Sequence, residues 1–233
     1  MSDQKDSDFA RRRLLYGRRH GHKLRQGQQD LVDNLLPNLA VDLDRADEPG
    51  GLFSDDTDDI WLEIGFGGGE HLAAVAAIHP NIGFFGCEPF VNGVAKLLAQ
   101  ISANRLENIR IHMGDARDLL DKIPEGALGR AMLLFPDPWP KTRHHKRRFV
   151  NQETLAQLHH ALKPGAEFRV ATDIPDYCRW TLAHIHRFGG FDWLAERPAD
   201  WRVRPSDWPE TRYEQKALRQ GRTPVYLRFR RNP

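Results

Sequence analysis

The alternation of two kinds of segment constrains the fold of this chain more than any other feature. From residue 60 onward, apolar runs of strand length alternate with longer amphipathic runs. This alternation is typical of βαβ units, in which helices connect the parallel strands of one sheet. We therefore expect an α/β fold with a doubly wound, mostly parallel sheet and helices on both faces. Strands are predicted at residues 60–64, 82–88, 109–112, 131–135, 167–172 and 225–229, and helices at residues 71–79, 91–104, 152–162, 176–187 and near Asp118.

Two charged segments of opposite sign precede this pattern. Acidic residues predominate between residues 42 and 59 and surround the Pro49-Gly50-Gly51 break, which is typical of a solvated linker. Residues 1–55 are therefore interpreted as a basic N-terminal arm with an acidic linker, and residues 56–233 as the main domain. Between residues 9 and 29 every charged side chain is basic, which favours a polyanionic partner: Arg11, Arg12, Arg13, Arg18, Arg19, Lys23 and Arg25.

Length and cysteine usage exclude several classes of protein. An α/β chain of 233 residues is usually one domain with an extension or two. No stretch reaches the roughly twenty apolar residues of a membrane span, and the first residues lack the apolar core of a secretory signal. Cys87 and Cys178 lie far apart in apolar segments, which argues against a disulfide framework and favours Cys87 as a packing residue. The sequence predicts a soluble, cytoplasmic protein.

A glycine-rich turn follows the first predicted strand. Gly65 and Gly67 lie between that strand and the next helix, where a backbone without side chains lets a nucleotide-like ligand approach. The spacing for a dinucleotide would require glycine where Glu70 stands. Acids at three successive strand ends suit a ligand that offers amine and hydroxyl donors and no phosphate, and S-adenosyl-L-methionine is favoured over NAD. These acids are Glu63, Glu88 and Asp115, although each of them could also simply cap a helix.

Residues 135–148 combine a rigid turn with a basic run. Three prolines fix the backbone around Asp137 and Trp139 at the end of the fourth strand, and the ring of Trp139 either stacks on a base or fills the sheet edge. The following run suits contacts with phosphates, although an exposed solvated loop would look the same. His144 and His145 have no His or Cys partner at metal-ligand spacing, so no metal is expected. The basic run consists of Arg143, His144, His145, Lys146, Arg147 and Arg148.

Residues 135–148 resemble the motif of bacterial tRNA (guanine-N(7)-)-methyltransferases, and the resemblance extends through most of the chain from Gly17 onward. It implies the Rossmann-like class I methyltransferase fold, S-adenosyl-L-methionine as the methyl donor, and nitrogen 7 of a guanosine in the variable loop of tRNA as the acceptor. Gly68 and Gly114 depart from the commoner family pattern. The other matching pieces are Arg18-Arg19-His20-Gly21 with Gln28, residues 62–67, Ala171-Thr172-Asp173 and Thr211-Arg212-Tyr213-Glu214.

The resemblance also implies roles for individual residues. The cofactor pocket would be lined by the three strand-end acids and Asp137, next to the glycine turn, and the basic run would touch RNA. Thr211 and Glu214 also have the spacing of a helix capping box, which leaves a purely structural interpretation open. The substrate guanosine would be contacted by Lys141, Asp173, Thr211 and Glu214.

The chemistry of this acceptor needs little acid–base catalysis. The lone pair of guanine nitrogen 7 is free at neutral pH, so aligning nitrogen, methyl carbon and sulfur is the main task, and positioning supplies about 7 to 11 kcal/mol in general. We hypothesise that Asp137 is the catalytic residue, which holds the base and stabilises the positive charge that develops on it. A small-molecule or protein methyltransferase and a non-catalytic RNA-binding protein remain alternatives. The sequence leaves open whether the protein is a monomer or a homodimer, and it predicts an N-terminal arm that orders on RNA.

Overall fold

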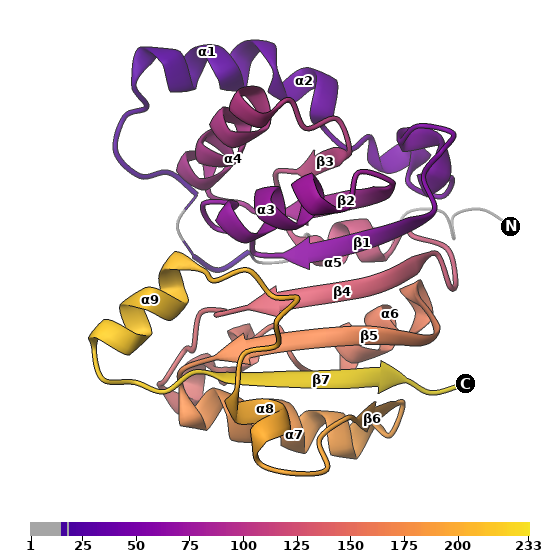
Figure 1. Cartoon of the computed structure of the whole chain (residues 1–233), viewed down its shortest axis with the longest axis vertical. Helices are drawn as coiled ribbons and strands as arrows, with labels where there is room; N and C mark the ends of the chain where they lie inside the picture. The colour runs from indigo at the N-terminus through magenta and orange to yellow at the C-terminus, as the bar shows by residue number, and fades with distance from the viewer. Residues whose placement is uncertain (1–14, 18) are drawn as a thin grey trace, which may run out of the picture.

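Within residues 15–17 and 19–233, the part of the chain that the computed structural model describes, seven strands form one sheet (Figure 1). Their spatial order is β3-β2-β1-β4-β5-β7-β6. The first five strands run parallel, and β7 runs antiparallel to both β5 and β6. The strands are β1 (Asp59–Ile64), β2 (Ile82–Cys87), β3 (Ile109–His112), β4 (Leu128–Leu134), β5 (Leu162–Thr172), β6 (Phe191–Trp193) and β7 (Val225–Arg231).

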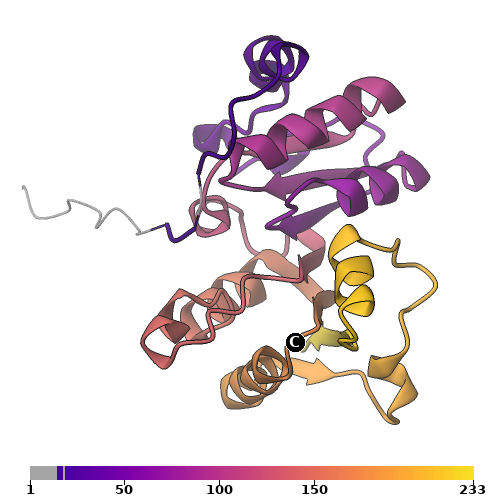
Figure 2. The ribbon, with the colours of Figure 1, turned by 90° about the vertical axis from the view of Figure 1, so that its left-hand side faces the viewer.

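Helices cover both faces of this sheet, as Figure 2 shows for α6 and α9. None of the helices within the described residues has the length and apolar character that crossing a membrane would require. The α-helices are α1 (Gln26–Asn34), α2 (Leu36–Leu39), α3 (Glu70–Ile78), α4 (Val91–Asn104), α5 (Ala116–Leu120), α6 (Gln152–Ala161), α7 (Pro175–Phe188), α8 (Ala199–Arg202) and α9 (Arg212–Arg219), and the 3-10 helices are η1 (Leu43–Arg45), η2 (Pro49–Leu52) and η3 (Thr142–Arg147).

The two faces carry separate hydrophobic cores because side chains alternate along each strand. In β1, Leu62 packs with α5, α6 and α7 on one face, whereas Trp61 packs with α3 and α4 on the other. Leu62 and Phe168 are fully buried, and each such burial contributes about 1.5–3 kcal/mol. The predicted doubly wound, mostly parallel sheet is confirmed. The predictions omitted β6, a short edge strand, and the helices α1, α2 and α8. They indicated α9 only through the capping-box spacing of Thr211 and Glu214, because its polar sequence gives little apolar signal.

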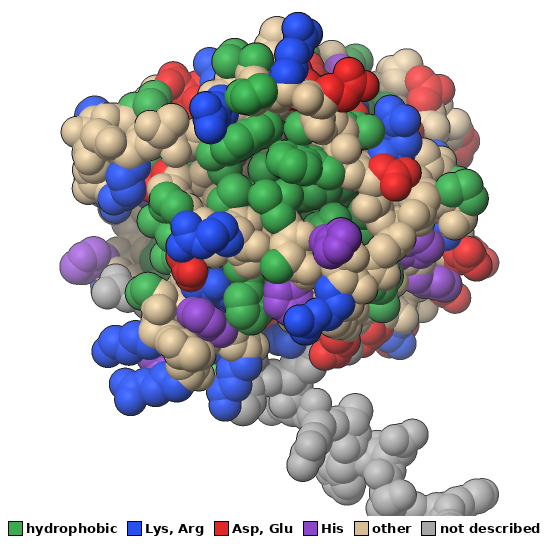
Figure 3. Space-filling view, turned by 90° about the horizontal axis from the view of Figure 1, so that it is seen from below, with side chains coloured by type: hydrophobic (Ala, Val, Ile, Leu, Met, Phe, Trp, Pro, Cys, Tyr) green, Lys and Arg blue, Asp and Glu red, His purple; other side chains and the backbone are tan. Residues whose placement is uncertain are grey.

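The edge strand β6 is the shortest of the seven strands, and its neighbour in the sheet is the antiparallel strand β7. It spans three residues and pairs with β7 on one side. Seen from below (Figure 3), hydrophobic side chains gather near the centre of the face at this end of the molecule, between basic and acidic side chains. Trp193 of β6 and Val203, which follows α8, are among the exposed large hydrophobic residues.

The segment interpreted as an acidic linker is largely built into the fold. It contains η1 and η2, and the side chain of Ala46 is fully buried. Just before it, Val41 donates a backbone hydrogen bond of 2.9 Å to Ile111 of β3. The acids face solvent while small apolar residues between them reach the core, a pattern that charge counting alone does not distinguish from a solvated linker.

Part of the basic arm is docked on α4. The backbone N–H of Val91 donates to the carbonyl of Arg19 at 3.1 Å, and Asn92 bonds to both Gly21 and His22 at 2.7 Å. The first of these bonds satisfies an N–H group that the start of a helix leaves without an intrahelical partner. Arg19, Lys23 and Arg25 are exposed. Arg11, Arg12, Arg13 and Arg18, which the sequence assigned to the same basic surface, lie outside the described residues.

Candidate active site

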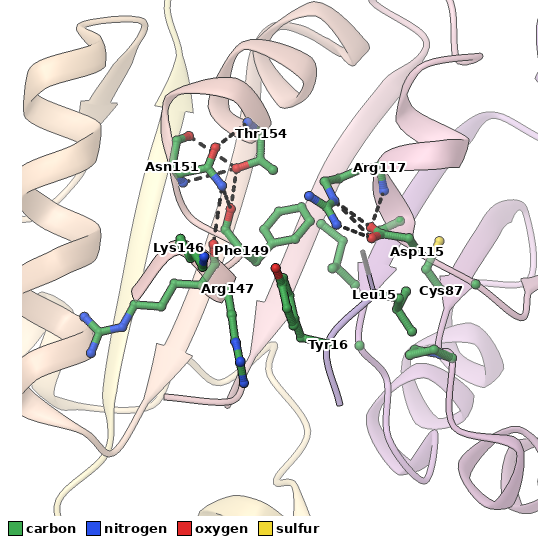
Figure 4. Close-up of a pocket in the computed structure, with 16 residues that line it drawn as sticks. Leu15, Tyr16, Cys87, Asp115, Arg117, Lys146, Arg147, Phe149, Asn151 and Thr154 are labelled. Atoms are coloured by element: carbon green, nitrogen blue, oxygen red, sulfur yellow. Dashed lines mark hydrogen bonds and ion pairs between the residues drawn. The ribbon is translucent and has the colours of Figure 1, made fainter. Parts of the chain in front are cut away.

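A cleft of about 650 Å³ opens at the carboxyl ends of the parallel strands. In an open α/β sheet, ligands bind outside these strand ends, where the order of the strands reverses. In this sheet the order reverses between β1 and β4. A narrower pocket of about 150 Å³ continues the cleft toward β3 (Figure 4). The two spaces share the lining residues Tyr16, Ile64, Gly65, Pro89, Arg147 and Phe149.

Glu88, at the end of β2, fixes the glycine turn that follows β1. Its carboxylate accepts the backbone N–H of Gly67 at 2.8 Å and that of Phe90 at 3.0 Å. Burial raises the pKa of Glu88, and the two N–H donors oppose that rise. Gly67 has a φ of 59°, a left-handed conformation that glycine adopts without strain. A Cβ added at Gly93 of α4 would lie only 2.1 Å from the Gly67 carbonyl oxygen, so α4 lies directly against the turn.

The other two strand-end acids are already partnered. Glu63 is buried, and its Oε2 lies 2.7 Å from Nδ1 of His71. It lines a smaller adjoining pocket together with Thr211. Asp115 caps α5 by accepting the N–H of Arg117 at 3.0 Å and pairs with the Arg117 guanidinium at 2.5 Å (Figure 4). The cap predicted as the alternative for Asp115 is therefore present, while its side chain also lines the narrower pocket.

The floor of the narrower pocket contains a cysteine that lacks nucleophilic character. Cys87 is buried at the end of β2, and burial raises its pKa. A thiol of raised pKa carries little thiolate, which is the reactive form. Cys87 therefore serves as packing for the pocket, in agreement with the prediction.

Asp137 lies in the larger half of the cleft on a strained turn. Phe135 and Trp139 have φ values of 50° and 41°, a region that non-glycine residues rarely occupy and that costs on the order of 1–3 kcal/mol each. Both residues precede a proline, which restricts their backbones further. Desolvation by the cleft walls raises the pKa of Asp137. The turn thus holds the Asp137 carboxylate at a defined place, and Asp137 and Glu88 line the same cleft.

An aromatic and cationic cluster forms the mouth of the cleft. The Arg147 guanidinium carbon lies 4.5 Å from the ring centroid of Tyr16 and 4.9 Å from that of Trp139. Such cation–π contacts contribute about 0.5–1 kcal/mol when exposed. The rings of Tyr16 and Trp139 meet edge to face at 6.4 Å. Trp139 thus joins the arm to the Asp137 turn and also lines the cleft.

Of the residues expected to contact the guanosine, Thr211 lines the smaller adjoining pocket, whereas Lys141, Asp173 and Glu214 are not among the residues that line the cleft. Lys141 is exposed and directly precedes η3. Asp173 follows β5, and its carboxylate accepts a hydrogen bond from Arg222. Thr211 caps α9 by accepting the N–H of Glu214 at 3.0 Å. The Glu214 side chain turns away from a capping box.

Glu214 is buried and bonded to two side chains. It accepts the hydroxyl of Tyr226 at 2.5 Å and pairs with Arg204 at 3.0 Å. A buried carboxylate requires such partners to offset its loss of hydration. These contacts anchor α9 to β7, and the structure thereby brings Thr211 beside the cofactor turn while Glu214 faces the sheet.

The basic run does not behave as one surface. Arg143 and Lys146 are exposed, His144, His145 and Arg147 are half-buried, and the Arg148 side chain is 1% exposed. Because η3 turns every few residues, consecutive basic side chains point in different directions. The run therefore presents part of its charge to solvent and directs Arg148 into the protein.

Several residues at the site escaped the sequence interpretation. Tyr16 was overlooked because a single aromatic residue within a basic arm carries no local signal. A Cβ added at Gly67 would lie 3.1 Å from the Tyr213 ring, so this ring covers the turn although it comes from a distant segment. Arg117 and Asn151, which line the narrower pocket, lie in ordinary helix-start sequence. Among the described residues, no group of three His, Cys, Asp or Glu side chains is arranged to hold a metal ion.

Comparison with known proteins agrees with this geometry. A family described as putative methyltransferase matches residues 57–227. The chain is 53% identical to the tRNA (guanine-N(7)-)-methyltransferase of Paracoccus denitrificans, over 94% of this chain and 95% of that protein. It is 52% identical to the protein of the same name from Bradyrhizobium diazoefficiens, over 99% of this chain and 97% of that protein.

Solved structures show the same fold at low sequence identity. The 16S rRNA methyltransferase KamB matches with a TM-score of 0.57 and 18% identity, over 78% of this chain and 95% of that one. The 16S rRNA (adenine(1408)-N(1))-methyltransferase of Catenulisporales acidiphilia matches with a TM-score of 0.52 and 15% identity, over 83% and 94%. The fold is therefore that of the Rossmann-like class I methyltransferases. With near full-length relatives at more than half identity, the chain belongs to the family of the tRNA (guanine-N(7)-)-methyltransferases.

Proposed function

We propose that this chain transfers the methyl group of S-adenosyl-L-methionine to nitrogen 7 of a guanosine in the variable loop of tRNA. The observation that carries the proposal is the arrangement of Glu88 and Asp137 in one cleft. Glu88 holds the glycine turn at 2.8 Å, and Asp137 stands on a rigid turn beside it. A donor bound against the glycine turn then faces an acceptor held at Asp137.

The residues of the cleft fit this cofactor. A carboxylate offers about four acceptor positions, and Glu88 uses two of them on Gly67 and Phe90, which leaves positions for ribose hydroxyls. Asp115 and Asn151 supply polar groups in the narrower pocket, where an adenine ring would lie on the apolar wall beside Cys87. Gly65 has a φ of 70° and leaves its side of the cleft open. Glu63 would act from behind the turn, through His71 and the first turn of α3.

The protein's own contribution is alignment and exclusion of water. S-adenosyl-L-methionine supplies an activated methyl group on a sulfonium, and it leaves as S-adenosylhomocysteine. Asp137 holds the guanine and stabilises the positive charge that develops on its ring. The nucleoside is oriented by Lys141, Asp173, Thr211 and Glu214. For this, the carboxylate of Asp173 has to bind the nucleoside as well as Arg222, and that of Glu214 has to bind it as well as Arg204.

The exposed basic residues hold the RNA backbone while the base is extruded. Exposing a base costs a few kcal/mol, and contacts with phosphates from Arg143, Lys146 and the arm offset this cost. His144 and Arg147, at the mouth of the cleft, would meet the nucleotide next to the target. Both cysteines are free thiols, which suits a reducing compartment, and we place the reaction in the cytoplasm.

The experiment is transfer of labelled methyl groups from S-adenosyl-L-methionine to unmodified tRNA, followed by nucleoside analysis. We expect 7-methylguanosine with the wild-type protein and with Asp192→Asn, an exposed carboxylate on the edge strand. Asp137→Asn should lose nearly all transfer. Cofactor binding without transfer to tRNA would point to a small-molecule or protein acceptor, and tRNA binding without cofactor binding would point to a non-catalytic RNA-binding protein.

A further inference from the structure

Arg148 stands at the end of the basic run, yet its environment is unlike that of a residue that contacts RNA. Its side chain is 1% exposed. Its Nε donates to the carbonyl of Pro138 at 2.9 Å, and its Nη2 lies 3.5 Å from the carbonyl of Trp139. The same Nη2 pairs with Asp176 at 2.5 Å. These three contacts are all made by Nε and Nη2 of the planar guanidinium.

The flat face of the same group is also covered. The Arg148 guanidinium carbon lies 5.5 Å from the ring centroid of Tyr177 and 4.9 Å from that of Trp180. Both rings belong to α7, and Trp180 is held in turn by a hydrogen bond of 2.6 Å to the carbonyl of Val150. A guanidinium enclosed on an edge and on a face has little freedom to swing out toward solvent.

These contacts join two loops that face the acceptor. Pro138 and Trp139 belong to the turn after β4 that carries Asp137, whereas Asp176 lies in the first turn of α7, three residues after Asp173 at the end of β5. Because β4 and β5 are neighbours in the sheet, their ends lie side by side. Arg148 bridges them, and a shift of either loop would break its bonds to the other.

The turn needs such a brace because its backbone is strained. Phe135 and Trp139 are both left-handed before prolines, and a strained conformation persists only when the surroundings hold it. The guanidinium donates to the carbonyl oxygens of Pro138 and Trp139, which directly follow Asp137, and so fixes the turn on that side. A buried cation that loses one partner is costly, so the brace and the ion pair with Asp176 depend on each other.

We propose that Arg148 is a positioning residue that holds Asp137 in place for methyl transfer and makes no contact with a tRNA phosphate. This inference rests on the proposed function. It separates Arg148 from Arg143 and Lys146, whose side chains are exposed in the same run. A positioning role predicts an effect on the rate of the chemical step, whereas a phosphate contact predicts an effect on tRNA affinity and on its dependence on salt.

The test uses Arg148→Lys, which keeps the charge but loses the planar fork that reaches both loops. Single-turnover methylation is measured with saturating cofactor and tRNA, and tRNA affinity is measured over a range of salt concentrations. We expect the rate to fall on the order of 10²-fold, the cost of a displacement near 1 Å, while affinity and its salt slope remain as in the wild type. Asp176→Asn, at a carboxylate that is half exposed, should lower the rate in the same direction without loss of folding.

Arg143→Ala is the matched control from the exposed part of the run, at a residue that lines neither the cleft nor the narrower pocket. It should weaken tRNA binding and reduce the salt slope by about 1. If Arg148→Lys behaves like this control, or leaves both the rate and the affinity unchanged, the inference is wrong. If Arg148→Lys fails to fold, Asp176→Asn decides by the same criteria. Absence of methylation by the wild-type protein would instead contradict the proposed function itself.

Discussion

The carboxylate of Glu88 accepts the backbone N–H of Gly67 at 2.8 Å, so the end of β2 determines the shape of the turn that follows β1. Glu88→Gln keeps the size of the side chain but replaces one acceptor oxygen by a donor. Hydrogen bonds to charged groups contribute about 1.5–3 kcal/mol, so binding of S-adenosylhomocysteine should weaken roughly 10- to 100-fold in calorimetry. Glu107→Gln, an exposed residue with the same charge change, should bind normally. Equal affinity in the two variants would contradict this role for Glu88.

The raised pKa of Asp137 predicts a pH dependence of methyl transfer. The carboxylate form exists above the pKa, and desolvation by the cleft moves that pKa upward from its usual value. As pH falls, the single-turnover rate at saturating cofactor and tRNA should therefore decline at a higher pH than the ordinary pKa of an aspartate would give. Asp137→Asn should be about 10²–10³-fold slower, and its residual rate should lack this decline. An unchanged pH profile in the variant would assign the titration to another group.

The sequence predicted those site residues whose position depends on the order of the strands. It did not predict those whose role depends on the direction of a side chain. Glu88 and Asp137 were found because the carboxyl ends of parallel strands meet at one edge. Tyr213 over Gly67 depends on where α9 packs, which requires the anchoring of Glu214 by Tyr226 and Arg204. A run of basic residues likewise cannot show that Arg148, which directly follows the 3-10 helix, turns inward, because its burial is decided by partners from α7.

Close contact between α4 and the glycine turn makes Gly93 sensitive to substitution. A Cβ at Gly93 would lie 2.1 Å from the backbone of Gly67, and such overpacking costs about 1–3 kcal/mol. Gly93→Ala should lose stability by this amount in denaturant unfolding and should also weaken cofactor binding. Gly27→Ala in α1, where a Cβ meets nothing within 4 Å, should instead gain roughly 0.5–1 kcal/mol, because alanine is the better helix former. A similar gain in both variants would show that α4 can move away from the turn without cost.

Asn92 ties the arm to the start of α4. Its side chain accepts from the N–H of Gly21 and donates to the carbonyl of His22, each at 2.7 Å. Asn92→Ala removes both bonds, each of which contributes about 0.5–1.5 kcal/mol. Trypsin should then cleave after Lys23 and Arg25 roughly tenfold faster, because cleavage follows the population of the open form.

Asn104→Ala is the control for this arm experiment. Asn104 lies at the far end of the same helix, and among the contacts described its side chain bonds only to the carbonyl of Gln100. Its cleavage rate should match that of the wild type. Addition of tRNA should slow cleavage in every variant if the arm closes over bound RNA. Cleavage of Asn92→Ala at the wild-type rate would mean that other contacts hold the arm.

The order of the strands has a consequence for synthesis on the ribosome. β7 is translated after β6 but lies between β5 and β6 in the sheet. A nascent chain that has reached residue 220 has made β6 and α9, but it lacks the strand that joins β6 to the sheet and the Tyr226 hydroxyl that anchors Glu214. The α9 wall of the cleft is therefore anchored late in elongation. An unfinished polypeptide would contain the pocket proposed for the methyl donor, but α9 would not yet be fixed on the acceptor side of the cleft.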